Sequence, residues 1–426
     1  MSDATRTGSD LIVVIGAGVA GIMTAYALAK RGLNVAVIDA LSGPAEMGSR
    51  ANAGIIAVGH AKAWAGPEAL SAMLNAFVGR NPSVKVTRVT DPALWHWGVE
   101  FLLNCSPPAH RRNTDKLQRL SRYSRDLAAA AAIQMNLSAA IRHQGCLYLF
   151  RDKAQFSTYV ASIKNNSDGS IEILERDALL AREPGLSGMS ARLVGGLFSA
   201  TDSVGDCRLF TECAAAYLNQ THNVRLHFNT RATGFRRANN IIEAVQTNDG
   251  DIPCSAVILA TGVETSDITH PLGFRANIYP VKGYSGTWKI IDAAGVPTIP
   301  YVDETELLGV ATYGGKLRVT AIAEFAARDR SVSEASMTHI GEYARQFFGD
   351  AIDLDTPQFW AGLRPTTPAG PPYLGRVRRF ENVWVNAGHG QLGWTMSFGC
   401  GELLAQRITG EQTSLENVSA TASWLV

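Results

Sequence analysis

The sequence predicts an α/β fold in which a Rossmann-like nucleotide-binding domain is interleaved with an α+β domain that carries an antiparallel sheet. Two patterns predict it. The first is an apolar run over residues 11–15 that leads directly into Gly16-Ala17-Gly18-Val19-Ala20-Gly21. The second is a strand-like run over residues 308–325 around Gly314-Gly315, which is a two-residue hairpin signal. Parallel strands followed by an antiparallel hairpin indicate two separate sheets.

The first elements of the chain form a strand, a helix and a second strand. Residues 11–15 are rich in β-branched side chains, as expected of a parallel strand buried on both faces. The glycine-rich turn opens a helix that runs to about Ala29. Lys30 and Arg31 fall in its last turn, and Gly32 stands where a helix-ending glycine belongs. Residues 35–38 form the second strand, which ends at Asp39.

This order of elements indicates a dinucleotide site. Gly16 allows the tight turn, Gly18 lets the backbone approach a pyrophosphate, and Gly21 lets the helix pack closely on the strand. The helix N-terminus then faces the phosphates, and Asp39 can accept hydrogen bonds from the ribose hydroxyls. An acid at this position disfavours a 2′-phosphate, so NAD or FAD is favoured over NADP.

The composition is typical of a soluble enzyme with two or more domains. The chain has 426 residues, of which 46% are hydrophobic and 18% are charged. A net charge of +1 argues against a nucleic-acid partner. The six cysteines are scattered and form no CxxC pair, so neither a metal site nor a disulfide framework is indicated, and reduced thiols in the cytoplasm fit best.

Two N-terminal segments could be mistaken for targeting signals. Residues 11–29 lack charge and are long enough to span a membrane, but they contain three glycines and change period midway, which favours a buried strand and helix. No basic region with a small-residue cleavage site precedes them, so no secretory signal is predicted. Residues 1–8 are expected to form a disordered polar leader.

Two later motifs favour FAD over NAD. Residues 48–54, Gly-Ser-Arg-Ala-Asn-Ala-Gly, form a second loop of small and polar side chains. A flavin dinucleotide is longer than one mononucleotide fold can cover and needs such a loop. Residues 256–262, Ala-Val-Ile-Leu-Ala-Thr-Gly, are a further buried strand that ends in a small turn. Taken alone, that turn is an ordinary strand end.

Five motifs along the chain resemble the FAD-dependent D-amino-acid dehydrogenases of the glycine/D-amino-acid oxidase family. They are Ser49-Arg50-Ala51-Asn52-Ala53-Gly54, the segment 202–211, Tyr279-Pro280-Val281-Lys282-Gly283-Tyr284-Ser285, Gly362-Leu363-Arg364-Pro365 and Gly388-His389-Gly390-Gln391-Leu392-Gly393-Trp394-Thr395. The resemblance implies a FAD-binding domain of the glutathione-reductase-like class, built from residues 9–95, 187–270 and 350–426. It implies a substrate-binding domain built from residues 96–186 and 271–349.

The resemblance and the nucleotide motif together give a set of predicted cofactor contacts. The first group comprises Gly16, Gly18, Val19, Ala20, Gly21, Asp39, Ser49, Arg50, Asn52, Ala53 and Gly54. The second comprises Ala232, Ala260, Thr261, Gly262, Gly390, Gln391, Leu392, Gly393, Trp394 and Thr395. His389 lies in the same glycine-rich turn and is interpreted as part of the flavin cradle rather than as a catalytic base.

Arg364 is the predicted anchor for a substrate carboxylate. It lies between Leu363 and Pro365 with no carboxylate in the local sequence, and a guanidinium matches a carboxylate with two parallel hydrogen bonds. The alternative is a structural ion pair with a distant acid. By resemblance, the matching arginine of the family holds the amino-acid carboxylate.

Four further residues are candidates for the substrate site. Lys282 is a candidate for a second carboxylate contact or a position near the flavin, with a surface turn lysine as the alternative. Tyr284 and His60 are candidates for lining the pocket, as is Tyr279, although each of these residue types is more often simply a half-buried aromatic. Relatives tend to have tyrosine where this chain has His60, so the preferred substrate side chain stays open.

The resemblance implies oxidative deamination of a D-amino acid to a 2-oxo acid and ammonia, by hydride transfer from Cα to flavin N5. Electrons would pass to a respiratory-chain acceptor, either a quinone or an electron-transfer protein. One alternative substrate is a secondary amine such as D-hydroxyproline, D-proline or sarcosine. A flavin-binding subunit that is inactive without its partner, and a plain NAD-binding module, are the alternatives from other classes.

A basic amphipathic helix is expected over residues 115–136. Leu117, Leu120, Leu127 and Ala131 fall on one stripe, and six basic residues surround it: Arg111, Arg112, Lys116, Arg119, Arg122 and Arg125. The basic face is either simply solvated or a docking surface for an anionic membrane or an acceptor protein. The family resemblance implies a cytoplasmic enzyme at the inner face of the bacterial membrane.

Overall fold

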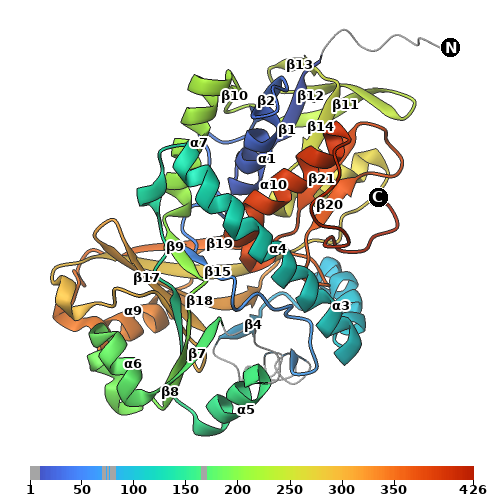
Figure 1. Ribbon diagram of the computed structural model, residues 1–426. Coiled ribbons are helices and arrows are strands. Elements are labelled where there is room, and N and C mark those ends of the chain that lie inside the picture. The colour runs from blue at the N-terminus through green and yellow to red at the C-terminus, as the bar shows by residue number, and fades with distance from the viewer. Residues whose placement is uncertain (1–9, 70–72, 74–75, 77–82, 165–169) are drawn as a thin grey trace.

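The computed structural model describes residues 10–69, 73, 76, 83–164 and 170–426. The predicted leader over residues 1–8 lies outside the described residues. A six-stranded sheet forms the upper half of the molecule in Figure 1, and a nine-stranded sheet forms the lower half. Helix α4 (Pro107–Gln134) crosses between them.

The six-stranded sheet has the order β10-β2-β1-β14-β21-β20. Its strands are β1 (Ile12–Ile15), β2 (Val35–Ile38), β10 (Arg225–His227), β14 (Ala256–Leu259), β20 (Tyr373–Arg376) and β21 (Val383–Ala387). All neighbours are parallel except β20 and β21. Strands β1, β2 and β14 are buried along their whole length. Continuous apolar runs are what a sheet covered on both faces requires.

Helices α1 (Val19–Ala29) and α10 (Gly393–Thr409) pack against each other beside this sheet, and α7 (Cys207–His222) packs against α1. Close approach is possible because Gly401 of α10 lies against the backbone of Met23, where a Cβ atom would meet the Met23 carbonyl oxygen at 2.6 Å. Helix α1 ends at Ala29, as predicted, and Gly32 three residues later has a positive φ of 77°. Lys30 and Arg31 were predicted in the last turn but follow it, because the helix stops at Ala29.

The nine-stranded sheet has the order β19-β15-β18-β17-β16-β6-β8-β7, and β4 pairs with β18 off this path. Its strands are β4 (Val84–Val86), β6 (Cys146–Phe150), β7 (Ile171–Glu175), β8 (Gly195–Ser199), β15 (Tyr279–Lys289), β16 (Tyr301–Asp303), β17 (Leu308–Tyr313), β18 (Lys316–Phe325) and β19 (Gln358–Thr366). The predicted hairpin is confirmed: Gly314 and Gly315 both have positive φ between β17 and β18.

The strand pairing differs from the predicted domain segments at three places. Strands β4, β8 and β19 fall in segments assigned to the FAD-binding domain, yet they pair within the nine-stranded sheet. The reason is long-range pairing: β19 lies beside β15, about 80 positions earlier in the chain, over nine residue pairs. A local hydrophobic pattern carries no information on such partners.

The remaining elements complete the two halves. Two three-stranded sheets contain β11 (Ala232–Ala238), β12 (Ile241–Thr247) and β13 (Gly250–Pro253), and β3 (Ile55–Ile56), β9 (Ser203–Gly205) and β5 (Ile141–Arg142). The described residues also include the helices α3 (Pro92–Asn104), α5 (Lys153–Lys164), α6 (Arg176–Arg182), α8 (Thr265–Thr269) and α9 (Glu334–Phe348). The predicted helix over 115–136 is confirmed as α4, but it begins at Pro107 because a proline is accommodated in the first turn of a helix.

Candidate functional site

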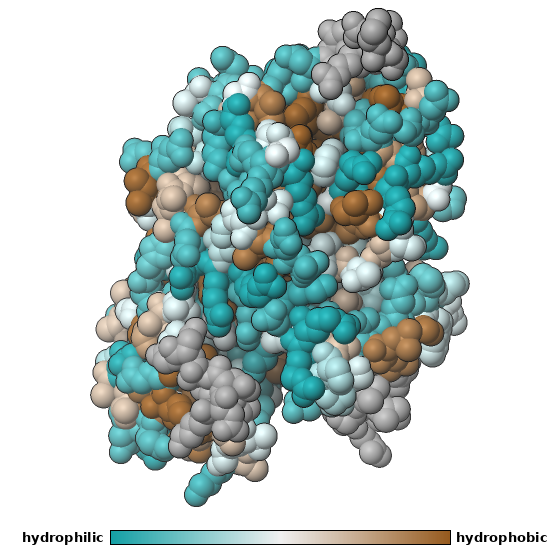
Figure 2. Space-filling view, turned by 45° about the vertical axis from the view of Figure 1, so that its right-hand side comes forward, coloured by the Kyte–Doolittle hydropathy of each residue, from teal (hydrophilic) through white to brown (hydrophobic). Residues whose placement is uncertain are grey.

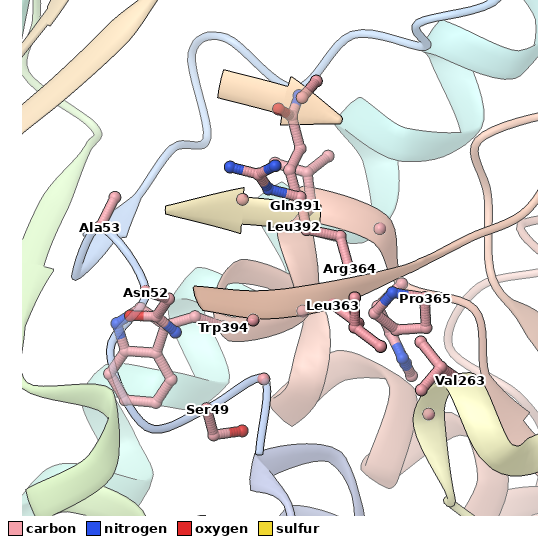
Figure 3. Close-up of a pocket in the computed structure, with 18 of the residues that line it drawn as sticks. Ser49, Asn52, Ala53, Val263, Leu363, Arg364, Pro365, Gln391, Leu392 and Trp394 are labelled. Atoms are coloured by element: carbon pink, nitrogen blue, oxygen red, sulfur yellow. The ribbon is translucent and has the colours of Figure 1, made fainter. Parts of the chain in front are cut away.

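A cavity of about 2230 Å³ lies between the two large sheets. It is lined at one end by Gly16, Gly18 and Asp39, and elsewhere by Arg364, Tyr284 and His60. Pockets for a single small ligand are about 300–1,000 Å³. The cavity therefore has room for a dinucleotide and a substrate together. Figure 3 shows how distant segments surround it: Ser49, Asn52 and Ala53 follow β2, Arg364 belongs to β19, and Gln391, Leu392 and Trp394 lie at or just before the start of α10.

The nucleotide end is built from backbone that approaches very closely. Gly16 has a φ of 109°, and a Cβ atom there would lie 2.5 Å from the Ala260 carbonyl oxygen. A Cβ atom on Gly21 would overlap the Gly16 carbonyl oxygen, so this glycine sets the packing of α1 on the turn. Gly21 does not line the cavity. These positions agree with the roles that the sequence pattern predicted for a dinucleotide turn.

Asp39 stands at the carboxyl end of β2 and faces the turn. Its two carboxylate oxygens accept hydrogen bonds from the backbone N–H groups of Ala17 at 2.7 Å and Leu41 at 2.9 Å. Each oxygen keeps a second lone pair, because a carboxylate can accept about four hydrogen bonds. The side chain lines the cavity and is thus held ready to accept from a ribose.

The loop after β2 contributes Ser49, Asn52 and Ala53 to the cavity wall. The Ser49 hydroxyl accepts a hydrogen bond from the Val19 N–H at 3.2 Å, at the first turn of α1. Two predicted contacts of this loop are not at the wall. Arg50 is exposed, and Gly54 turns the chain into β3 with its carbonyl bound by the Gly205 N–H at 2.9 Å.

The C-terminal turn brings Gly390, Gln391, Leu392, Gly393 and Trp394 to the wall, opposite Ala232, Ala260, Thr261 and Gly262. Thr395 lies behind it and accepts a hydrogen bond from the Ala57 N–H at 3.1 Å. His389 is buried, its Nε2 lies 2.9 Å from the Asn386 side-chain oxygen, and burial lowers its pKa to about 4. A neutral, internally bonded imidazole fits the cradle role better than that of a base.

These residues fit a flavin dinucleotide. Trp394 lines the cavity, and its buried indole Nε1 has no hydrogen-bond partner among the described residues. Such an orphaned donor is costly unless a ligand satisfies it. The open start of α1 and the glycines around it offer the backbone donors that a pyrophosphate requires. FAD would be held by the Gly16–Asp39 segment, the Ser49–Ala53 loop and the turn before α10.

Arg364 projects from β19 into the cavity and has no carboxylate partner among the described residues. Its guanidinium occupies the space above Gly283, where a Cβ atom would overlap it. Nη1 donates to the carbonyl oxygen of Ile322 at 2.9 Å and to that of Lys282 at 3.4 Å. Burial lowers the pKa of Arg364 to about 10, so the group stays a cation at neutral pH.

A β-bulge in β18 presents the carbonyl that holds Arg364. The pairing of β15 with β18 shifts between Lys282↔Glu324 and Tyr284↔Ala321, which leaves one extra residue in β18. Ile322 there has a φ of 69°, a left-handed conformation that is unfavourable for a β-branched side chain. This irregularity turns the Ile322 carbonyl toward the cavity cation.

Three of the candidate substrate-site residues donate hydrogen bonds to acidic side chains. The Lys282 ammonium is buried, donates to Asp329 at 2.7 Å and does not line the cavity. That hydrogen bond holds the pKa of Asp329 below its usual range. The Tyr284 ring lines the cavity, but its hydroxyl donates to Glu324. Tyr279 donates to Asp91 at 3.0 Å and lies away from the wall. Lys282 is paired with Asp329 and is not part of the cavity wall, so its predicted contact with a substrate carboxylate gains no support from these contacts.

His60 lies at the wall as predicted, in a stack of aromatic rings. Its ring centroid is 4.6 Å from that of Tyr148 and 5.8 Å from that of Tyr159. Burial is the main cause that lowers the pKa of His60 to about 3, and the nearby Lys62 ammonium adds to it. His60 is therefore neutral at physiological pH.

Two features of this site were not predicted from the sequence. Ile322 gave no signal, because a bulge depends on the pairing of two strands rather than on local composition. Glu304 and Lys62 line the cavity beside His60, and an acid and a base on separate loops are common surface residues in any sequence. A hint was available for Lys62 alone, since it lies two positions after His60 in an otherwise apolar loop.

Comparison with known proteins identifies relatives over nearly the whole length. A family model described as FAD dependent oxidoreductase matches residues 12–407. A D-amino acid dehydrogenase 2 of Mesorhizobium japonicum is 35% identical over 407 residues, which cover 95% of this chain and 98% of the relative. A D-amino acid dehydrogenase of Azorhizobium caulinodans is 36% identical, with 95% and 97% covered.

A solved structure shares the fold. Glycine oxidase from Geobacillus kaustophilus superimposes with a TM-score of 0.74, over 96% of this chain and 97% of that chain, at 19% sequence identity. At this sequence identity, the similarity supports a shared fold and nothing further. It agrees with the predicted α/β architecture of a Rossmann-like unit joined to an antiparallel sheet.

Proposed function

The chain belongs to the family of FAD-dependent oxidoreductases, and from this premise we propose that it oxidises a D-amino acid to a 2-oxo acid and ammonia. Support for this substrate comes from relatives named D-amino acid dehydrogenase, which match nearly the full length of both chains at 35–36% identity. The family membership accounts for FAD as the cofactor. The substrate assignment has to be argued from the site.

One observation carries the proposal: Arg364 is a cation in the same cavity as the nucleotide cradle, and no described carboxylate pairs with it. A partly buried guanidinium without a counter-ion is costly unless a ligand supplies one. The carbonyl oxygen of Ile322 takes one N–H group of the fork and leaves others for a ligand. A planar carboxylate satisfies such a fork with two parallel hydrogen bonds.

The mechanism assigns orientation and desolvation to the protein. Arg364 binds the α-carboxylate, and Gly283 gives the guanidinium the room to lie flat over β15. The walls around it include Tyr284, Leu308 and Ala321, which exclude water from the reacting carbon. When bound, FAD accepts the hydride that leaves Cα. The imino acid formed is then hydrolysed by water to the 2-oxo acid and ammonia.

No side-chain base is assigned to this reaction. His389 is buried and hydrogen-bonded to Asn386, and Lys282 is paired with Asp329. The lone pair of the neutral substrate amine can assist departure of hydride from Cα without a protein group. Catalysis would then rest on holding the carboxylate at one fixed point beside the cofactor cradle.

The electron acceptor is proposed to be a quinone or an electron-transfer protein at the cytoplasmic face of the membrane. No helix among the described residues is long and apolar enough to cross a bilayer. Helix α3, at the right of Figure 1, exposes an apolar stripe of Trp95, Val99, Leu102 and Leu103, with exposed fractions from 47% to 73%. Apolar patches of this kind interrupt the mostly hydrophilic face in Figure 2.

Exposed cations lie close to this stripe in the sequence. Arg111 and Arg112 are exposed in the second turn of α4, directly after the end of α3. An apolar helical stripe flanked by basic residues is typical of helices that lie in the plane of an anionic lipid surface. Leu103→Glu should weaken co-sedimentation with vesicles of anionic lipid, and Arg345→Glu on the exposed face of α9 is the matched control.

The proposed reaction is tested by anaerobic bleaching of the bound flavin. The purified holoprotein is mixed with D- and L-amino acids, D-proline, D-hydroxyproline and sarcosine. Bleaching by D-amino acids with release of ammonia and a 2-oxo acid supports the proposal. Bleaching by the secondary amines alone would move the substrate to that class. A yellow protein that no amine bleaches would mean that the chain is a flavin-binding subunit in need of a partner.

A further inference from the structure

A short segment of the cavity wall, residues 55–60, has its backbone held by side chains instead of by a neighbouring strand. We call this segment the strap. Its first two residues form β3, which pairs with β9, and the pairing stops at Ile56. The next three N–H groups, of Ala57, Val58 and Gly59, all donate to side-chain oxygens. These three residues line the cavity, so the residues that supply the oxygens fix this part of its wall.

The nucleotide half of the molecule supplies the first oxygen. The Ala57 N–H donates to Oγ1 of Thr395 at 3.1 Å. Thr395 lies in the first turn of α10 and follows Trp394, whose indole N–H has no partner among the described residues. Helix α10 packs against α1 beside the six-stranded sheet. This hydrogen bond therefore ties the strap to the elements that would hold FAD.

Asp202 supplies the oxygen for the other two N–H groups of the strap. Its Oδ1 accepts from Val58 at 2.8 Å and from Gly59 at 2.7 Å. Its Oδ2 accepts from the Tyr148 hydroxyl at 2.5 Å, and the Tyr148 ring stacks on His60 with centroids 4.6 Å apart. Asp202 follows β8 and Tyr148 belongs to β6, which are both strands of the nine-stranded sheet. One carboxylate thus ties the strap to the substrate half.

Asp202 is a buried acid that is satisfied by hydrogen bonds. It is 1% exposed and does not line the cavity. Burial raises the pKa of this carboxyl, and the hydrogen bonds from Gly59 and Tyr148 oppose that rise. A buried charge is costly unless hydrogen bonds satisfy it, so the carboxylate and its donors hold one another in place. Packing is tight as well, because a Cβ atom on Gly59 would lie 2.3 Å from the Ser199 hydroxyl oxygen.

We propose that Asp202 is a positioning residue for hydride transfer, which fixes the strap between the two halves and thereby sets the cofactor cradle at its distance from the substrate. The inference rests on the proposed function. The substrate is held at Arg364 in β19 of the nine-stranded sheet, whereas the cradle belongs mainly to the six-stranded half. Hydride leaves Cα only when the reacting atoms are closely aligned, and a misplacement of about 1 Å can cost about 100-fold in rate.

Two variants of Asp202 separate its geometry from its charge. Asp202→Glu keeps the charge, but its added methylene group pushes the acceptor oxygens into the strap. Asp202→Asn keeps the length, because its Oδ1 can accept from both N–H groups while its Nδ2 donates to the Tyr148 oxygen. The limiting rate constant of flavin reduction is measured anaerobically by stopped flow at saturating amine. We expect it to fall about tenfold or more in the glutamate variant and less than about threefold in the asparagine variant.

The concentration of amine that gives half of the limiting rate should stay within about threefold in both variants, because Arg364 is untouched. Asp206→Ala is the matched control. Asp206 lies in the same motif, caps α7 by accepting from the N–H groups of Arg208 at 3.0 Å and Leu209 at 3.2 Å, and does not line the cavity. This variant should lower the melting temperature and leave the rate of flavin reduction in place.

Hydrogen exchange of the strap gives a readout that does not depend on turnover. The amides of Val58 and Gly59 should exchange faster in Asp202→Glu than in the wild type, and at the wild-type rate in Asp206→Ala. Visible absorbance verifies that each variant holds its flavin. Equal rates of flavin reduction in the glutamate variant and the wild type would overturn the inference, and so would equal losses of rate in the glutamate and asparagine variants.

Loss of flavin from both Asp202 variants would assign this residue to folding and would also overturn the positioning role. A raised half-saturating concentration with an unchanged limiting rate would assign Asp202 to substrate binding instead. These outcomes leave the proposed function intact, since the wild-type flavin is still bleached by the amine. If no amine bleaches the wild-type flavin, the proposed function fails and this inference fails with it.

Discussion

The two ends of the cavity are built in different ways. The nucleotide end is made mainly of backbone from contiguous motifs, with Gly16 and Gly21 giving the closest approaches. The substrate end is made of side chains from segments far apart in the chain: Arg364 is held by Ile322, 42 positions away, and His60 contacts Tyr159, 99 positions away. A site of backbone tolerates almost no added atom, whereas a site of side chains can lose one partner and keep its shape.

This difference predicts which property of the protein a substitution at each end of the cavity should impair. Substitution at the nucleotide end should act on cofactor retention and folding, because the chain itself cannot move aside. Substitution at the substrate end should act on kcat/KM while the protein stays yellow. This predicted difference between the two ends would be contradicted by a substrate-end variant that loses its flavin. A variant of the nucleotide turn that keeps full activity would contradict it as well.

The largest effect is expected from Gly21→Ala. The added methyl group would overlap the Gly16 carbonyl oxygen, and strained backbone packing costs about 3 kcal/mol or more. The purified variant should be poorly soluble or colourless by visible absorbance. Gly98→Ala is the matched control, because a Cβ atom there meets nothing within 4 Å on helix α3. A yellow Gly21→Ala protein with the melting temperature of the wild type would contradict the packing argument.

Arg364→Leu is expected to cost about 3–5 kcal/mol of transition-state binding, or roughly two to four powers of ten in kcat/KM. The flavin should remain bound, since Arg364 lies in the substrate part of the cavity. The kcat/KM of Arg364→Lys should fall between those of the wild type and the leucine variant, because lysine keeps the charge but cannot form two parallel hydrogen bonds with a carboxylate. Steady-state kinetics with the best D-amino acid measure both. Near-normal kcat/KM in the leucine variant would contradict the proposal that Arg364 binds the substrate carboxylate.

Gly283→Ala should act on the same anchor indirectly. Its methyl group would overlap the guanidinium of Arg364, which must shift from the Ile322 carbonyl. Overpacking of this kind costs about 1–3 kcal/mol. We expect KM to rise about 10- to 100-fold while flavin content is kept. Gly341→Ala in α9 makes only an ordinary contact, at 3.9 Å from Phe359, and should leave KM in place.

The smallest effect concerns His389, the buried histidine of the cofactor end. Its folded pKa of about 4 lies below the ordinary value of 6.5, so between these pH values the unfolded chain binds a proton that the folded chain excludes. The stability from this group is complete above pH 6.5 and declines as the pH falls, by at most about 1.4 kcal/mol per pH unit. The melting temperature of His389→Gln should drop less than that of the wild type between pH 7 and pH 5; equal drops would assign the acid sensitivity to other groups.

Much of the nucleotide end could be predicted because its signals are local. The glycine spacing, the strand before it and Asp39 after it lie within about thirty residues, and the hairpin glycines lie between their own two strands. The positions of these elements are confirmed. Local patterns could not predict the long-range pairing: strands β4, β8 and β19 pair within the larger sheet, and the Lys282 ammonium donates to Asp329.

By itself, the sequence determined a dinucleotide turn, a buried parallel strand on each side of it, and an arginine without a nearby acid. These follow from steric rules that act within a few residues of the chain. Only the tertiary structure decided that the arginine shares one cavity with the cradle, that a bulge at Ile322 holds it, and that Glu304 and Lys62 line the same cavity as His60. The physical reason is that strand register fixes which side chains face each other, and register is set by packing over the whole sheet.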